Sequence, residues 1–487
     1  MELRIQILTE GYAYTGYGHL SRCTAIARAF GAEGERVLFV INGDENASHL
    51  VRPFPSVVFN WLEERERLLE RLSEADIVIV DSYLADKKLY ESIRSRVKTC
   101  VFLDDFNRLD YPEGIVVNGT VGAERIPYRP THGSLYLLGK DYVILREAFM
   151  DLPKEREIKE HIETVLITFG GSDPLNQTSK VLLNLVQLKN DWKKIVILGA
   201  AFSKMGEIKV IADERTSLYQ DVSAKEMRDL MLKADLAFSA AGQTINELAI
   251  TGLPAVIFKV ADNQDYNIEG WEKVGFIETY LDATKGWKVG DLENVLSGLM
   301  DRKQRTFFSR KGREQVDGKG VFRIRKTALR AFHERNLQIR LAEEKDVLPL
   351  FELANDPVVR HNSFSTQAIP WEEHVRWMRA TLRNETRRLF VCCEGDELVG
   401  QVRFDKEGDE SVVSVSLSAS YRGMGLASVL LVRALSVYKE MEKDVSRVLA
   451  YVKVENIASQ HAFVRAGFRE CESDNEQVMR YSYGYGD

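Results

Sequence analysis

The stretch RIQILTEGYAYTGYGHLSRCTAIARAF, residues 4–30, decides the fold of the first part of the chain. It places a short apolar run, a glycine-containing turn and a helical segment in succession. Apolar runs of the same kind recur at VLFVIN (37–42), IVIVD (77–81), CVFLDD (100–105) and IVVNG (115–119). Because β-rich runs alternate with helical stretches, we predict a parallel sheet with helices on both faces.

A second series of the same kind begins after a charged linker that contains proline, DLPKEREIKE (151–160). Its apolar runs are TVLITFGG (164–171), KIVILG (194–199), LAFSAAG (236–242) and PAVIFKV (254–260). The repetition predicts two tandem α/β units of the Rossmann-like kind, over residues 1–150 and 151–335. The charged segment 302–335 is expected to be helical.

The last part, residues 336–487, has a different pattern. A strand-like run (337–342) precedes two helical segments (346–355 and 371–382), a predicted hairpin (389–404) and further strands separated by helices. This mixture predicts a third domain of the α+β class. The sequence shows no internal repeat and no low-complexity tract.

The composition limits the class of protein. A chain of 487 residues that is 45% hydrophobic and 29% charged is expected to form two or three globular domains. The net charge of −7 argues against the broad basic surface that binds nucleic acid or anionic membranes. The five cysteines lack zinc-type spacing, and no signal peptide or membrane span is visible. We therefore expect a cytoplasmic protein with reduced thiols, and the sequence carries no indication of its oligomeric state.

The glycine-containing turn after the first strand carries a histidine, His19. The turn, from Gly16 to Cys23, lies at the carboxyl end of the predicted parallel sheet, where open α/β folds bind ligands. A helix N-terminus disfavours the cationic imidazole, so His19 is suited to act as a base. The alternative is that His19 only caps or packs the helix, because short glycine motifs occur in many unrelated proteins.

The second α/β unit carries a candidate nucleotide-binding motif. The segment from Ser239 to Glu247 follows one strand and enters a helix, and FGGSDP (169–174) follows another strand. Amides at a helix N-terminus suit a pyrophosphate, and the Thr244 hydroxyl and the Glu247 carboxylate suit ribose hydroxyls. A plain glycine-containing helix start is the alternative. It is less favoured because ADNQDYN (261–267) adds polar groups after the next strand.

Residues 1–300 resemble the inverting UDP-sugar hydrolases of pseudaminic acid biosynthesis. These enzymes cleave UDP-2,4-diacetamido-2,4,6-trideoxy-altropyranose and are related to the two-domain GT-B glycosyltransferases. The resemblance rests on GYGHLSRC, VDSY, FLDD, VVNG, LLGKDYVILREAF, ITFGGSDP, SAAGQTINEL, TGLPAV and ADNQ. It implies that the two Rossmann-like units form a GT-B-like arrangement.

The same resemblance implies that His19 is the general base that activates water against the anomeric carbon. The implied UDP-sugar-binding residues are Gly18, Arg22, Asp81, Ser172, Gly242, Gln243, Thr244, Glu247 and Asn263. The family often has histidine where this chain has Ser82, which puts a sugar-binding role at that position in doubt. No His/Asp/Glu cluster of metal-ligand spacing accompanies these motifs, so hydrolysis is expected to need no metal.

The last domain contains a second predicted phosphate-binding turn. The run VVSVSLS (412–418) leads into YRGMGLA (421–427) and a long apolar helix, an arrangement in which successive amides point at a pyrophosphate. Asn456 and Ser459 follow a later strand. Together these two motifs resemble those of the GNAT-type N-acetyltransferases, across residues 337–487.

The GNAT resemblance implies acetyl-CoA as cosubstrate, bound between two strands, with a main-chain amide near Leu417 polarising the thioester carbonyl. The implied acetyl-CoA-binding residues are Leu417, Arg422, Gly423, Gly425, Ala427, Asn456 and Ser459. Many relatives have a tyrosine general acid where this chain has Phe463, so that the general acid is left open and solvent can serve. Residues at the implied acceptor site are Arg360, Asn362, Ser363 and His374, for which plain surface polarity is the alternative.

The two resemblances together predict a bifunctional sugar-nucleotide enzyme. It would N-acetylate a UDP-4-amino-4,6-dideoxy sugar with acetyl-CoA and hydrolyse the UDP-diacetamido sugar to UDP and free sugar. One alternative is a GT-B glycosyltransferase fused to an N-acyltransferase, which would require a second sugar as acceptor. Another is a C-terminal domain that senses acyl-CoA without turnover.

Overall fold

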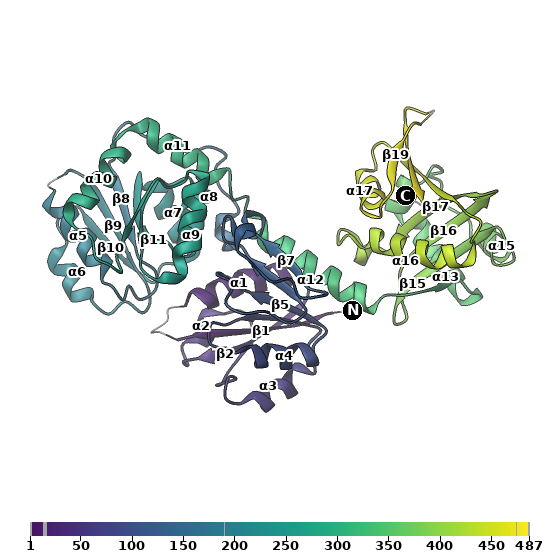
Figure 1. The fold of residues 1–487 in the computed structure, drawn as a ribbon, viewed down its shortest axis with the longest axis horizontal. Helices are drawn as coiled ribbons and strands as arrows, with labels where there is room; N and C mark the ends of the chain where they lie inside the picture. Colours follow the sequence, from purple (N-terminus) through teal and green to yellow (C-terminus); the bar gives the residue numbers. More distant parts are fainter. Residues whose placement is uncertain (1, 13–16, 189, 474, 486–487) are drawn as a thin grey trace. The chain divides into compact units, whose positions relative to one another are not determined.

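The computed structural model describes residues 2–12, 17–188, 190–473 and 475–485, so Gly16 of the predicted turn lies outside the described residues. The chain divides into two compact units, residues 1–328 and 329–487. The boundary between them falls within one helix, α12 (Gly320–Asn336). The predicted boundary between residues 335 and 336 lies in the same helix (Figure 1).

The first unit contains two parallel sheets, as the alternating pattern predicted. The first sheet has the strand order β3-β2-β1-β4-β5-β6-β7. Its strands are β1 (Arg4–Gly11), β2 (Arg36–Gly43), β3 (Ser56–Val58), β4 (Ile77–Asp81), β5 (Thr99–Leu103), β6 (Ile115–Asn118) and β7 (Leu135–Leu138). Its helices are α1 (Gly18–Gly31), α2 (Ala47–Leu50), α3 (Arg65–Leu72) and α4 (Lys87–Arg96). Figure 1 shows α1 on one face of this sheet and α3 and α4 on the other.

The second sheet has the order β10-β9-β8-β11-β12-β13. Its strands are β8 (Thr164–Thr168), β9 (Lys193–Leu198), β10 (Thr216–Gln220), β11 (Leu236–Ala240), β12 (Ala255–Lys259) and β13 (Tyr280–Asp282). Its helices are α5 (Gln177–Gln187), α6 (Met205–Ile211), α7 (Ala224–Lys233), α8 (Thr244–Thr251), α9 (Asp265–Val274), α10 (Val289–Met300) and α11 (Arg302–Arg313). The charged segment that precedes the last domain is helical, as predicted, and forms α11 and α12.

Both sheets reverse their strand order where the predicted motifs lie. In the first sheet the chain moves outward from β1 to β2 and β3, and later from β4 to β5, β6 and β7. The second sheet reverses in the same way between β8 and β11. Open α/β sheets bind ligands at the carboxyl ends of the strands that flank such a switch point. The fold therefore positions the turns after β1, β4, β8 and β11 as ligand-binding segments.

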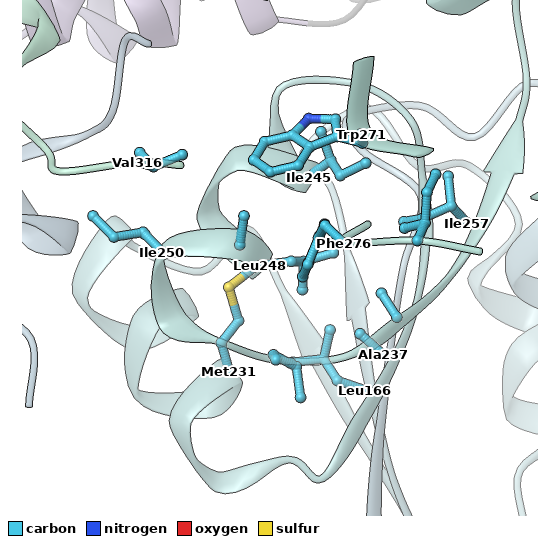
Figure 2. Packing of buried hydrophobic residues seen from close by; sticks show 14 of the residues in the cluster. Leu166, Met231, Ala237, Ile245, Leu248, Ile250, Ile257, Trp271, Phe276 and Val316 are labelled. Atoms are coloured by element: carbon cyan, nitrogen blue, oxygen red, sulfur yellow. The ribbon is translucent and has the colours of Figure 1, made fainter. Parts of the chain in front are cut away.

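A hydrophobic cluster joins the segment that leaves the first sheet to the helices of the second. Val121, Val143 and Phe149 from the first part pack in one cluster with Ile245 and Trp271 of α8 and α9. Figure 2 shows Ile245 beneath the indole of Trp271 and Leu248 near Met231 in this cluster. The backbones also approach closely, because a Cβ atom on Gly270 would lie 1.7 Å from the carbonyl oxygen of Val121. Any side chain at position 270 would therefore push the two segments apart.

The second unit is built on a mixed sheet with the order β14-β15-β16-β17-β18-β20-β19. Its strands are β14 (Gln338–Leu341), β15 (Arg387–Glu394), β16 (Glu397–Glu407), β17 (Glu410–Leu417), β18 (Arg447–Lys453), β19 (Arg469–Cys471) and β20 (Val478–Gly484). Its helices are α13 (Val347–Asn355), α14 (Pro357–Asn362), α15 (Trp371–Leu382), α16 (Leu426–Met441) and α17 (Ile457–Arg465). The predicted α+β class is confirmed for this unit.

Strands β17 and β18 pair over only part of their length. They run parallel, and their register joins Glu410–Val412 to Arg447–Leu449. The remaining residues of the two strands, 413–417 and 450–453, have no pairing with each other. The strands therefore separate toward the carboxyl end of β17, where the predicted phosphate-binding turn begins.

Among the described residues, no helix of the chain is long and apolar enough to cross a membrane.

Candidate functional site

Three side chains from two neighbouring strand ends meet at the switch point of the first sheet. His19 and Arg22 lie in the first turns of α1, and Asp81 is the last residue of β4. The His19 Nδ1 atom lies 2.7 Å from Asp81 Oδ1. Arg22 donates to both oxygens of the same carboxylate, from Nε at 2.6 Å and from Nη2 at 2.5 Å. The structure thus joins the predicted base to a buried acid that lies 62 residues away in the sequence.

The electrostatics of this group keep Asp81 ionised. Asp81 has no exposed surface. Burial by itself would raise its pKa, but the Arg22 guanidinium and His19 outweigh burial and hold the pKa well below its usual range. A carboxylate can only accept a hydrogen bond, so Nδ1 of His19 carries the proton. No described residue bonds to Nε2, and this ring nitrogen is therefore left with its lone pair for a base role.

The surrounding residues fix the positions of Arg22 and His19. Arg22 Nη1 donates to both oxygens of Asp105 at 2.8 Å, and the Tyr83 hydroxyl donates to the same carboxylate. Tyr83 also places its ring edge-on to the His19 ring, with the centroids 4.4 Å apart. Burial, and secondly Asp105, raise the pKa of Tyr83, so its phenol remains a neutral donor. The imidazole is therefore held on two sides.

Ser82, the position where the family often has histidine, has a structural role. It is buried, and its hydroxyl donates to the carboxylate of Glu10. The amides of Tyr83 and Leu84 donate to the same carboxylate at 3.2 Å and 3.1 Å. Ser82 Oγ in turn accepts from the Ala85 amide at 2.8 Å. The serine therefore shapes the turn that carries Tyr83.

The predicted nucleotide-binding turn precedes α8. This helix has no side-chain cap at Gln243, but the Ile245 and Asn246 amides already donate to the carbonyls of Gly242 and Gln243, both at 3.1 Å. The amides of Gln243 and Thr244, which donate to no described residue, are the ones that can face an anion. A Cβ atom on Gly242 would meet a single neighbour within 4 Å, Gln264 Nε2 at 4.0 Å, so the turn is open on that side. Glu247 is committed to an ion pair in which Arg146 donates from Nε and Nη2 to its two oxygens, at 2.6 Å and 2.8 Å. Arg146 lies 101 residues earlier in the quoted motif LLGKDYVILREAF, and the motif analysis did not pair it with Glu247.

A small cleft contains residues that lie at the ends of strands of both sheets of the first unit. Its lining is Arg22, Leu103, Asp104, Asp105, Val117, Gly119, Thr120, Ile144, Gln243, Asn246 and Asn267. Of the predicted UDP-sugar-binding residues, Arg22 and Gln243 line it. Asn263 does not: it is exposed in the turn before α9, and Asn267, one helical turn further on, lines the cleft instead.

Asn246 is a further residue at this cleft that the motif analysis did not single out. It is 4% exposed, and its Oδ1 atom has no hydrogen-bond partner. Its Nδ2 atom donates to Gln243 Oε1 at 3.2 Å. A buried acceptor without a donor is costly, so the lining offers this oxygen to a ligand donor. The remaining predicted residues, Gly18, Ser172 and Thr244, are partly or fully exposed in their turns.

No group of three or more His, Cys, Asp or Glu side chains that could hold a metal ion occurs within the described residues. The metal independence of hydrolysis stays a prediction.

In the second unit, the turn before α16 has the open form that a phosphate requires. Gly423 and Gly425 have φ angles of 77° and 84°, in the left-handed region that favours glycine. A Cβ atom on Gly423 would meet nothing within 4 Å. Gly425 is the N-cap of α16 and makes no side-chain cap, so the amides of the first turn, including Ala427, face this space.

Arg422 is held away from this open turn. Its Nε atom donates to the carbonyl of Leu417 at 3.0 Å, and its Nη2 atom donates to Asp356 Oδ1 at 2.7 Å. Asn456 is the N-cap of α17, because its Oδ1 atom accepts from the Ser459 amide at 3.1 Å. Both residues therefore organise the backbone at the ends of the separating strands. Their predicted contact with acetyl-CoA stays a prediction.

Phe463 occupies the position of the tyrosine found in many relatives. It is 4% exposed, and its ring packs against Phe468 and Tyr481, with centroid distances of 5.1 Å and 6.3 Å. Phe463 carries no group that exchanges protons.

The four predicted acceptor residues do not share one surface. His374 is 2% exposed, and its Nε2 atom donates to the carbonyl of Val347 at 3.0 Å. Its ring contacts the rings of Phe351 and Trp377, and burial lowers its pKa. His374 is thus a packed core histidine, for which polarity on a helix was a misleading signal.

The other three acceptor candidates lie together around the end of α14. Arg360 donates to the Ser363 hydroxyl at 3.2 Å and to the carbonyls of Ser365 and Gln367. Asn362 Nδ2 donates to the carbonyl of Val358 at 2.9 Å. These contacts fix the loop after α14, so a role in acceptor binding stays a prediction for these three residues.

Comparison with known proteins shows what each part of the chain is similar to. The acetyltransferase (GNAT) domain family matches residues 336–469. An uncharacterized protein of Methanocaldococcus jannaschii is 25% identical over 511 aligned positions, covering 98% of this chain and 99% of that protein. The spore coat polysaccharide biosynthesis protein SpsG of Bacillus subtilis is 24% identical, covering 66% of this chain and 96% of its own length.

A further relative is a two-function protein of Helicobacter pylori, pseudaminic acid cytidylyltransferase and UDP-2,4-diacetamido-2,4,6-trideoxy-beta-L-altropyranose hydrolase. It is 25% identical, covering 56% of this chain and 48% of that protein. Among solved structures, spermidine N-acetyltransferase from Vibrio cholerae in complex with CoA and spermine is 20% identical. It covers 31% of this chain and 97% of its own, with a TM-score of 0.29.

These relationships define the class of protein as a fusion of a sugar-nucleotide enzyme with an acetyltransferase domain. The chain is a distant homologue of proteins of spore coat polysaccharide and pseudaminic acid biosynthesis, and its last part is a GNAT domain. The resemblance inferred from the sequence motifs is therefore confirmed at the level of this fusion.

Proposed function

We propose that the chain catalyses two successive reactions on one sugar nucleotide. The C-terminal unit transfers an acetyl group from acetyl-CoA to the amine of a UDP-4-amino-4,6-dideoxy sugar. The first unit then hydrolyses the UDP-diacetamido sugar to UDP and free sugar. The observation that carries this proposal is the buried Asp81 carboxylate bonded to His19 Nδ1 at a switch point of the sheet. The hydrolase named among the relatives supports it.

In the hydrolytic step His19 acts as the general base. Nε2 takes a proton from water while the water oxygen forms a bond to the anomeric carbon. The bond from that carbon to the β-phosphate oxygen breaks, and its electron pair leaves with UDP, which inverts the configuration. Asp81 holds the ring in the tautomer that leaves Nε2 unprotonated, and it stabilises the imidazolium that forms. Arg22 acts through Asp81 by keeping that carboxylate ionised.

The nucleotide is assigned to the turn before α8. The open side of Gly242 and the uncapped amides of α8 suit a diphosphate, which carries the charge that the helix N-terminus favours. Thr244 contributes a hydroxyl at this turn. Glu247 is proposed to accept from ribose hydroxyls through the lone pairs that Arg146 does not use. The proposal includes the GT-B-like arrangement of the two sheets that the motifs predict.

The residues of the second unit fit acetyl-CoA. Acetyl-CoA supplies an activated thioester whose acyl carbon is open to attack by an amine. Gly423 and Gly425 leave space for its pyrophosphate, and the separating strands β17 and β18 leave unpaired backbone for its pantetheine arm. The Leu417 amide is proposed to donate to the thioester carbonyl. Because Phe463 has no proton to give, we assign protonation of the leaving thiolate to solvent.

The full chain, acetyl-CoA and a panel of UDP-4-amino sugars test both halves in one mass-spectrometric assay. We expect a gain of one acetyl group on one member of the panel, followed by release of UDP and a free diacetamido sugar without a second sugar. Transfer of the sugar to an added acceptor, with no hydrolysis in its absence, would instead identify a glycosyltransferase. Tight acetyl-CoA binding with no turnover on any amino sugar would identify a sensor domain.

A further inference from the structure

The helix that joins the two units carries an arginine that reaches the open turn before α16. A methyl group placed on Gly425 would lie 3.8 Å from the Cδ and Nη1 atoms of Arg330 and 3.8 Å from Nη1 of Arg465. Arg330 belongs to α12, and Arg465 lies in the last turn of α17. Two guanidinium groups thus lie at one backbone position, where two positive charges repel each other unless an anion lies between them.

Neither guanidinium donates a hydrogen bond to a carboxylate of the described residues. Arg330 Nε forms a long ion pair with Glu334 Oε2 at 3.9 Å, beyond hydrogen-bond range, and the arginine side chain is 40% exposed. Arg465 makes no ion pair with any described residue. The arginine of the turn itself, Arg422, is committed to Leu417 and Asp356. The guanidinium groups available to an anion beside Gly425 are therefore those of Arg330 on α12 and Arg465 on α17.

The end of α12 is built into the acetyltransferase unit, so Arg330 is held in place. Arg433 of α16 donates to the carbonyls of Glu334 and Leu337, at 2.5 Å and 2.8 Å, and so caps the helix. His333 Nδ1 lies 2.7 Å from Glu394 Oε2, and both residues are buried. The His333 ring also meets the ring of Tyr421, the residue before Arg422, with centroids 5.1 Å apart.

We propose that Arg330 binds the pyrophosphate of acetyl-CoA and that the cofactor site of this chain therefore extends into the helix joining the two units. This inference rests on the proposed acetyltransferase function and adds a residue that lies outside the matched domain, residues 336–469. Each phosphate of the pyrophosphate carries a negative charge that the α16 amides face from one side and Arg330 faces from the other. The linker helix then acts as part of a binding site as well as a connection.

Isothermal titration calorimetry compares the CoA affinity of the wild-type chain with that of two Arg330 variants. Arg330→Ala should raise the Kd for CoA about tenfold, as expected for a partly exposed charge-assisted hydrogen bond. Arg330→Lys should recover part of this loss, because the charge remains and the planar fork is lost. Lys443→Ala is the matched control. This variant also removes one exposed cation. Lys443 lies beyond the C-terminal end of α16, and the 16 residues of this helix separate it from the Gly425 turn by about 24 Å.

A second ligand distinguishes a contact with the pyrophosphate from a contact with the 3′-phosphate of CoA. With 3′-dephospho-CoA the loss caused by Arg330→Ala should persist, because the pyrophosphate is still present. If the loss disappears, Arg330 faces the 3′-phosphate and the pyrophosphate assignment is wrong. If wild-type protein binds CoA and Arg330→Ala binds it equally well, the inference fails while the acetyltransferase function stands. If the wild-type protein does not bind CoA, the function and the inference fail together.

Discussion

Replacing His19 by asparagine tests the central assignment of the hydrolase site. Asparagine keeps an amide N–H that can donate to Asp81, so the buried pair of Asp81 and Arg22 remains satisfied. The variant lacks a nitrogen lone pair of suitable basicity, and the proton of the attacking water then has no acceptor. Loss of a general base lowers the rate by about 10²–10⁴-fold, which corresponds to roughly 2.7–5.5 kcal/mol in the activation barrier.

The cost to stability should be much smaller. The substitution removes one edge-to-face contact, between His19 and Tyr83, with the ring centroids 4.4 Å apart. Such a pair contributes about 0.5–1.5 kcal/mol. Since 1 kcal/mol shifts the Tm of a domain of 150–250 residues by roughly 2–4 °C, the variant should remain folded at 25 °C. UDP affinity should stay within about twofold of wild type, because the uncapped amides of α8 are unchanged.

The assay follows UDP release from an acetylated UDP-sugar, with UDP affinity and Tm measured on the same preparations. His49→Asn is the matched control, since it makes the same chemical change at an exposed histidine of α2 and should retain the full rate. A folded His19→Asn protein that hydrolyses at a rate within threefold of wild type would refute the base assignment. His19 would then be a packing residue of the helix start.

Four further outcomes are expected. Asp81→Asn should reduce the acid sensitivity of the first unit: the lowered pKa of Asp81 means that its stabilisation is present above about pH 4, the usual aspartate value, and is lost as the pH falls through the folded-state value. The wild type should therefore lose more unfolding free energy than the variant between pH 6 and pH 3 in urea titrations. Thr244→Ala should weaken UDP binding with little change in Tm. Glu247→Ala should weaken UDP binding and also lower the Tm, because it leaves Arg146 without its carboxylate partner. UDP affinities equal to that of wild type in both variants would contradict the assignment of the nucleotide to this turn. Gly425→Trp should abolish CoA binding and spare cleavage of an acetylated substrate, and a mixture of this variant with His19→Asn should restore the two-step conversion; loss of both activities in the single variant would indicate one composite site. Hydrolysis should proceed at the full rate in excess chelator, and activity that returns only on addition of magnesium would contradict the metal-independent mechanism.

The sequence predicted the central strands of the two parallel sheets and missed the outer ones, whereas in the mixed sheet it predicted the edge strand β14 and missed the inner strand β20. Runs such as IVIVD form β4 with every residue buried, so their hydrophobic signal is continuous. The edge strands β3 and β10 are short and half-exposed, with no such run. β19, at the edge of the mixed sheet, is three residues long and carries two exposed side chains. In the two parallel sheets, burial on both faces of a strand is therefore what made it predictable.

At the hydrolase site, the sequence located the motifs and could not pair them. His19 and Asp81 were both singled out, but their contact depends on the parallel register that sets Thr9 of β1 beside Asp81 of β4. The partners Asp105 and Arg146 lie in the quoted motifs FLDD and LLGKDYVILREAF, but these motifs are far in sequence from His19 and Glu247. Spacing along the chain carries no information about such contacts, because loop lengths between strands vary freely.

Polar residues in the acetyltransferase unit show why residue type alone is a weak guide to role. His374 and Arg360 are both predicted acceptor residues, yet the first is buried among aromatic rings and the second holds a loop. Arg330 lies in a segment whose charges indicated only a helix. Arg330 stands out only by its position. It lies beside the left-handed turn at Gly425 because α12, which carries it, is held by Arg433 of α16.

The two proposed sites share no described residue, and this has a chemical consequence. The hydrolase site takes its residues from positions 1–328, and the acetyl-CoA site takes its residues from positions 329–487. Each proposed site therefore recognises the UDP-sugar through residues of its own unit. The proposed hydrolase site must also distinguish the acetylated sugar from its amine precursor. The Asn246 oxygen in the cleft, which no described residue hydrogen-bonds, can accept from an acetamido N–H, but the amine precursor also carries N–H donors, so the distinction between the two sugars must come from contacts with the acetyl group itself.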